Sequence, residues 1–119
     1  MNRPALIFGL LFSFTSILIS WKEPLMVMGY SQQDEIKAGK LLISQSDCRT
    51  CHRDDYKLVG PSFKEIAIKY AAQKTAVNYL SEKIIKGGGG VWGEVKMQPH
   101  PTITKTDARK MSKYILSLK

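Results

Sequence analysis

The feature that most constrains this chain is a pair of cysteines followed at once by a histidine, in the run Cys48-Arg49-Thr50-Cys51-His52. A Cys-x-x-Cys-His run is the attachment motif of c-type haem. Two thiols on one turn of chain can add across the two vinyl groups on one edge of the porphyrin. The following imidazole then lies beneath the ring plane, where it can ligate the iron. The motif therefore predicts a chain that wraps one haem.

Three other functions of the cysteine pair have to be weighed. A dithiol redox motif is expected beside a βαβ pattern, and no strand pattern surrounds residues 48–51. Tetrahedral zinc needs four ligands, and the chain has two Cys and two His, with His100 far from the motif. A disulfide between Cys48 and Cys51 would close a strained loop. The balance favours haem attached through Cys48 and Cys51, with His52 as an iron ligand.

An uncharged, mostly apolar run near the N-terminus predicts export. Residues 5–20 carry no charge and follow Arg3, as in a secretory signal. The run is short for a membrane span, which needs about 20 residues. We predict that residues 1–30 are a signal peptide or N-terminal anchor with an undefined cleavage point, and that residues 31–119 form the functional domain. Export agrees with the cysteine motif, because c-type haem is attached outside the cytoplasm.

Helical periodicity dominates the rest of the chain, with helices expected over residues 31–46, 62–73, 75–86 and 105–118. Ser31 and Thr104 are predicted caps, and Pro61 is predicted to start the second helix at its first position. A glycine inside a helix costs about 1 kcal/mol, so Gly39 indicates close approach of another helix. Residues 87–90 are four glycines that end the third helix. The expected fold is all-α, with four helices around one haem.

Met97 is the predicted second axial ligand. A thioether opposite histidine raises the reduction potential of haem iron and fills the sixth coordination position. Packing as an apolar filler is the alternative. Three of the other methionines fall in the leader and one fits the apolar face of the last helix, namely Met1, Met26, Met28 and Met111. Elimination therefore favours Met97.

The formal net charge of +8 suits docking to acidic surfaces of redox protein partners. Nucleic acid is the other partner class for a basic chain. Export argues against it, and the lysines are scattered rather than gathered in one stripe.

Taken together and in order, these segments resemble the short bacterial class I cytochromes c that carry electrons in the periplasm. The resemblance covers residues 34–118 and rests on Gly39-Lys40-x-x-Ile43, Cys48-x-x-Cys51-His52, Val59-Gly60-Pro61, Gly87-x-x-Gly90-Val91-Trp92-Gly93 and Met97-x-Pro99. It implies the cytochrome c fold, in which the Gly39/Ile43 face of the first helix crosses the Tyr114/Ile115 face of the last.

The resemblance also implies roles for single residues. Cys48 and Cys51 would form thioethers, and His52 and Met97 would be the proximal and distal iron ligands. The Pro61 carbonyl would accept a hydrogen bond from the His52 ring and fix its orientation.

Two further residues would bind the haem propionates: Trp92 through its indole N–H and Lys83 through its ammonium group. Two positions depart from the family pattern. Lys96 stands where relatives often have proline, and His100 stands where an asparagine can bond the methionine sulfur, so His100 could instead compete for the iron.

The function that follows is a monomeric, non-enzymatic one-electron carrier in a respiratory or dehydrogenase chain. One alternative is a haem c subunit of an oxidase or dehydrogenase, anchored in the membrane by residues 5–20. A haem peroxidase is the enzyme alternative, but it needs an open sixth coordination position, which Met97 opposes.

Overall fold

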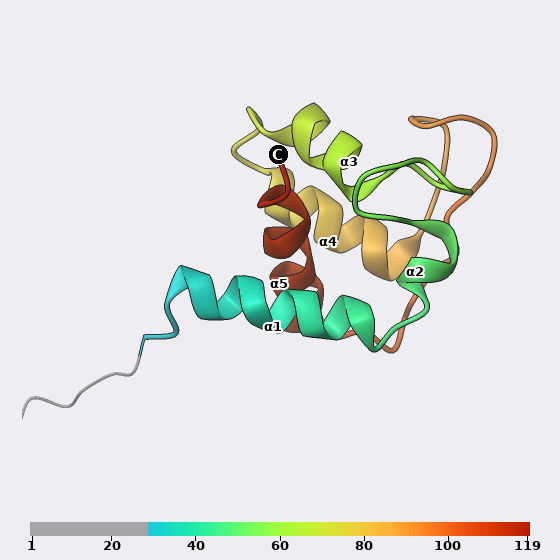
Figure 1. Ribbon diagram of the computed structural model, residues 1–119. Coiled ribbons are helices and arrows are strands. Elements are labelled where there is room, and N and C mark those ends of the chain that lie inside the picture. Colours follow the sequence, from blue (N-terminus) through green and yellow to red (C-terminus); the bar gives the residue numbers. More distant parts are fainter. Residues whose placement is uncertain (1–28) are drawn as a thin grey trace, which may run out of the picture.

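The computed structural model describes residues 29–119, and this part of the chain is helical (Figure 1). Its helices are α1 (Gln32–Ser44), α2 (Cys48–Cys51), α3 (Phe63–Tyr70), α4 (Ala76–Lys86) and α5 (Lys105–Leu116). Within residues 29–119 the β-pairing is limited to two isolated bridges, His52 with Lys57 and Gly88 with Met97. The predicted all-α fold is confirmed.

The predicted leader falls almost entirely on residues 1–28, outside the described part of the chain. Among the helices of residues 29–119, none has the length and apolar character that a membrane span requires. Whether residues 5–20 act as a signal or as an anchor stays a prediction.

Side-chain caps set where three of the helices begin. Ser31 accepts a hydrogen bond from the Asp34 amide, and Thr104 accepts one from the Asp107 amide, as predicted for both caps. The predicted position of Pro61 is wrong, because α3 begins after Ser62. Ser62 forms a reciprocal capping box with Glu65, which satisfies the free amides of the first turn better than proline could. Pro61 therefore precedes the cap.

Helix α5 lies at the centre and packs against α1, α3 and α4 (Figure 1). Gly39 is buried where α1 meets α5, and a Cβ atom there would overlap the backbone carbonyl of Lys110. The predicted close helix approach is confirmed, although the glycine meets α5 about one turn before the expected Tyr114/Ile115 face. An ion pair between Lys113 and Glu35 spans the same interface.

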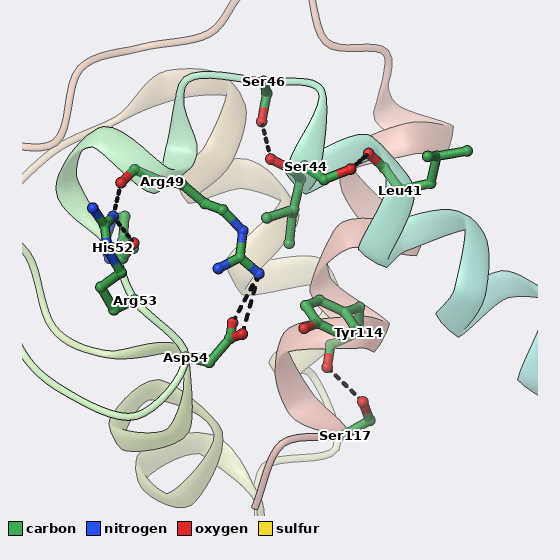
Figure 2. Close-up of polar contacts among 10 residues, drawn as sticks. Leu41, Ser44, Ser46, Arg49, His52, Arg53, Asp54, Tyr114 and Ser117 are labelled. Carbon is green, nitrogen blue, oxygen red and sulfur yellow. Dashed lines mark hydrogen bonds and ion pairs between the residues drawn. The ribbon is translucent and has the colours of Figure 1, made fainter.

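Helix α2 is a fifth helix that periodicity did not predict, since four residues are too few to show a period. It is a single turn formed by the cysteine motif itself, and the His52 amide bonds the Cys48 carbonyl at 3.0 Å. Figure 2 shows Arg49 of this turn reaching Asp54 beside Tyr114 of α5. The Arg49–Asp54 pair joins two atoms 3.1 Å apart, and it braces the turn that carries both cysteines.

Candidate haem-binding site

A cavity of about 500 Å³ lies between the α2 turn, α3, α4 and the loop that precedes α5. Its volume falls within the roughly 300–1,000 Å³ typical of cofactor sites. The buried part of the lining is mostly apolar and includes Ile43, Phe63, Ile66, Leu80, Ile84, Met111 and Ile115. All seven residues predicted from the sequence line this cavity: Cys48, Cys51, His52, Pro61, Lys83, Trp92 and Met97.

The His52 ring is buried and held from three sides. Its Nδ1 lies 2.6 Å from the Pro61 carbonyl oxygen, so Nδ1 carries the proton that it donates. Phe63 stacks on the ring with centroids 5.3 Å apart. Gly60 allows the close approach, since a Cβ there would lie 2.5 Å from His52 Cε1. The hydrogen bond that orients the ring leaves the Nε2 lone pair available to a metal.

Cys48 and Cys51 are free thiols at the two ends of the α2 turn. Cys48 is buried and accepts a hydrogen bond from the Ser46 hydroxyl at 2.9 Å. Burial raises the pKa of the Cys48 thiol above its ordinary value, which keeps it protonated rather than a thiolate at neutral pH. Two unpaired thiols beside an apolar cavity fit covalent attachment of a cofactor.

Met97 is presented to the cavity by its own backbone. The Met97 carbonyl accepts a hydrogen bond from the Gly88 amide at 3.0 Å, and the Met97 amide donates a hydrogen bond to the Gly88 carbonyl at 2.9 Å. Gly87 ends α4 with a φ of 67°, and a Cβ there would overlap the Met97 carbonyl. Figure 1 shows the orange segment after α4 leaving the helix bundle and returning to it. The paired backbone bonds close this loop and fix the half-buried Met97 at its base.

Cationic and aromatic groups surround the cavity near Trp92 and Lys83. The Lys69 ammonium lies 5.3 Å from the Trp92 ring centroid, and the Lys83 ammonium lies 5.6 Å from that of Tyr79. Sequence analysis did not identify Lys69, because the contact joins residues far apart in the chain. Burial, followed by the contact with Tyr79, raises the pKa of Tyr70 to about 12, so this phenol is neutral at physiological pH. The charges here suit the acidic substituents of a cofactor.

His100, a predicted departure from the family pattern, has both ring nitrogens engaged. Nδ1 lies 3.1 Å from the Ile84 carbonyl oxygen, and Nε2 lies 3.1 Å from Asp47 Oδ1. To compete for iron, the ring would have to give up at least one of these contacts. Neither Ile84 nor Asp47 was predicted as a partner, since both lie far from His100 in the sequence.

The donor set fits a covalently attached haem. One wall offers an imidazole nitrogen and two neighbouring thiols, and the closed loop after α4 offers a thioether sulfur. Histidine and methionine are an axial ligand pair of haem iron, and the two thiols match the spacing for vinyl addition. The apolar lining excludes water from such a group.

Comparison with known proteins agrees with this geometry. Residues 36–119 match the sequence model of the family described as Cytochrome c. Cytochrome c-552 of Nitrosomonas europaea is 41% identical over 95 residues, which span 80% of this chain and 87% of that protein. Cytochrome c-552 of Hydrogenobacter thermophilus is 45% identical over 82 residues, 69% of this chain and 83% of that protein.

Solved structures of cytochromes resemble this chain over a similar share of its length. The crystal structure of wild-type Nitrosomonas europaea cytochrome c552 superposes with a TM-score of 0.65 at 40% identity, and it covers 67% of this chain and 99% of the crystal chain. The Class 1 cytochrome MtoD of Sideroxydans lithotrophicus shares the fold with a TM-score of 0.60 at 24% identity.

Proposed function

This chain belongs to the cytochrome c family, and from that premise we propose that Cys48 and Cys51 would hold its haem c while His52 and Met97 would ligate the iron. The chain is a one-electron carrier with one covalent haem, not an enzyme. The observation that carries the ligand assignment is that an oriented imidazole and a backbone-fixed thioether line the same apolar cavity.

When bound, haem c supplies an iron that exchanges one electron between its Fe(III) and Fe(II) states. The chain's own residues keep the geometry constant during that exchange. Pro61 and Phe63 hold the His52 ring, and the Gly88 pairing holds Met97. Held in this way, His52 and Met97 would ligate the iron in both states, which would leave no place for a substrate. A site that changes shape little on reduction suits electron transfer rather than catalysis.

The cations around the cavity support a role in binding the two haem propionates. Trp92 would donate its indole N–H and Lys83 its ammonium, because both side chains line the cavity beside other polar groups. Lys69 would add positive charge through its position over Trp92. Charge-assisted hydrogen bonds of this kind are stronger than neutral ones.

We expect docking to acidic surfaces of redox partners at the mouth of this cavity. The mouth carries exposed apolar side chains, with Val59 51% and Val95 67% exposed. Lys57 and Lys96 are exposed nearby. An apolar centre with cations beside it fits a transient interface guided by charge.

Raising ionic strength should slow electron exchange with an acidic redox partner, because salt at 0.1 M largely screens the attraction between exposed charges more than about 10 Å apart. Stopped-flow rates measured against salt concentration would check this. Lys96→Gln should flatten the salt dependence, while Lys37→Gln on α1, outside the cavity lining, should leave it unchanged. A rate independent of salt would contradict docking through charge.

We also propose that the carrier works in the periplasm, because residues 5–20 form an apolar run and haem c is attached outside the cytoplasm. We propose in addition that it is monomeric. The membrane-anchored alternative depends on the same residues. Intact mass of the exported protein reports cleavage, and membrane fractionation separates a free carrier from an anchored subunit.

A spectroelectrochemical titration of the purified holoprotein tests the function. We expect one reversible wave with a slope of one electron and one haem per chain. Rapid catalytic turnover of peroxide by the reduced protein would favour the peroxidase alternative instead.

A further inference from the structure

We propose that His100 is a positioning residue for Met97, which fastens the ligand loop to the end of α4 and to the residue that precedes Cys48. The inference rests on the proposed role of Met97 as an axial ligand. It follows from three hydrogen bonds that converge on one residue three positions after that methionine.

The first two bonds complete the C-terminus of α4. The last carbonyls of a helix have no partner within the helix itself. The His100 amide donates to the Ile85 carbonyl at 3.0 Å, and His100 Nδ1 lies 3.1 Å from the Ile84 carbonyl. One residue from a distant loop therefore caps two adjacent carbonyls. Its ring is largely enclosed, with 17% of the side chain exposed.

The third bond reaches the cysteine motif. His100 Nε2 lies 3.1 Å from Oδ1 of Asp47, the N-cap residue of α2. Within residues 29–119 the Asp47 carboxylate makes no capping bond to α2 and instead contacts the imidazole of His100. Both ring nitrogens thus face oxygen acceptors. Whichever nitrogen carries the proton, the ring donates to at least one of these acceptors.

Two sets of hydrogen bonds therefore hold the loop that carries Met97. On one side the paired bonds with Gly88 close the loop, and on the other His100 ties it to α4 and α2. Withdrawal of the thioether from the cavity requires the loop to open. The His100 ring opposes that opening without belonging to the buried apolar cluster of the helices.

The test is the binding of free imidazole to the ferric holoprotein, which must displace the Met97 sulfur. His100→Ala should tighten imidazole binding about tenfold, which corresponds to about 1.4 kcal/mol less resistance to loop opening. Asp47→Asn should tighten it by about two- to threefold, as expected when one partly exposed hydrogen bond is weakened. Asp55→Asn removes an exposed acidic charge from another loop and should have no effect. His100→Asn keeps one donor and should lie between His100→Ala and wild type.

Amide hydrogen exchange supplies a readout that does not depend on iron ligation. In His100→Ala the amides of Gly88 and Met97 should exchange faster, while those of α1 and α5 stay as protected as in wild type. An imidazole affinity within twofold of wild type, or a loss of protection spread evenly over all helices, would overturn the positioning role. If instead wild type and Met97→Ala bind imidazole equally, the ligand assignment fails, and the exchange of the Gly88 and Met97 amides still decides the role of His100.

Discussion

Replacing Met97 with alanine is expected to lower the reduction potential by on the order of a few tenths of a volt, since axial ligands tune haem potentials over about 0.8 V. A soft thioether favours the ferrous state, and the water or added ligand that replaces it does not. The sulfur-to-iron charge-transfer band of the ferric protein should disappear. Potentiometric titration and the far-red absorption spectrum measure the two effects.

Met111→Leu is the matched control, because Met111 lines the same cavity from α5 and is 1% exposed. A volume-conserving change of this kind costs less than about 1.5 kcal/mol. The control should keep the charge-transfer band and a potential near that of wild type. Survival of the band in Met97→Ala, or its loss in Met111→Leu, would reverse the assignment.

Replacing Gly39 with alanine is expected to lower the free energy of unfolding by about 1–2 kcal/mol, the balance between overpacking and helix propensity. Alanine gains about 1 kcal/mol over glycine in helix propensity. The added Cβ, however, would overlap the Lys110 carbonyl. Overpacking costs typically 1–3 kcal/mol, sometimes more, and here the obstacle is backbone, which cannot move to another rotamer. The clash should therefore outweigh the propensity gain by separating α1 from α5.

Guanidinium unfolding followed by far-ultraviolet circular dichroism measures this loss. Lys40→Ala is the control, since it changes the adjacent, exposed position of α1 and alters the helix propensity only slightly, in favour of the helix. The control should unfold within about 0.5 kcal/mol of wild type, as surface changes generally do. A Gly39→Ala midpoint equal to that of wild type, or above it, would show that α1 and α5 do not need the glycine.

Local chemistry made much of this fold predictable. Ser31 and Thr104 cap their helices as expected, because a cap involves residues three positions apart. The Cys48-x-x-Cys51-His52 spacing indicated the cofactor for the same reason. Gly39 signalled a close helix contact, since glycine is costly inside a helix unless space requires it.

Features that depend on contacts between distant residues were harder to predict from the sequence. The prediction that Pro61 is the first residue of a helix was wrong, because the capping box of Ser62 and Glu65 sets the start of α3. The contacts of His100 with Ile84 and Asp47 join positions 16 and 53 residues apart, and no local pattern encodes them. The α2 turn was missed because four residues cannot show a helical period.

The most direct measurement is the coordination of the haem iron in both oxidation states, by magnetic circular dichroism and resonance Raman spectroscopy of the holoprotein. Ligation by His52 and Met97 predicts six-coordinate, low-spin iron with a histidine and a methionine ligand in the ferric and the ferrous protein alike. A five-coordinate, high-spin iron in either state, or a second histidine in place of the methionine, would contradict it.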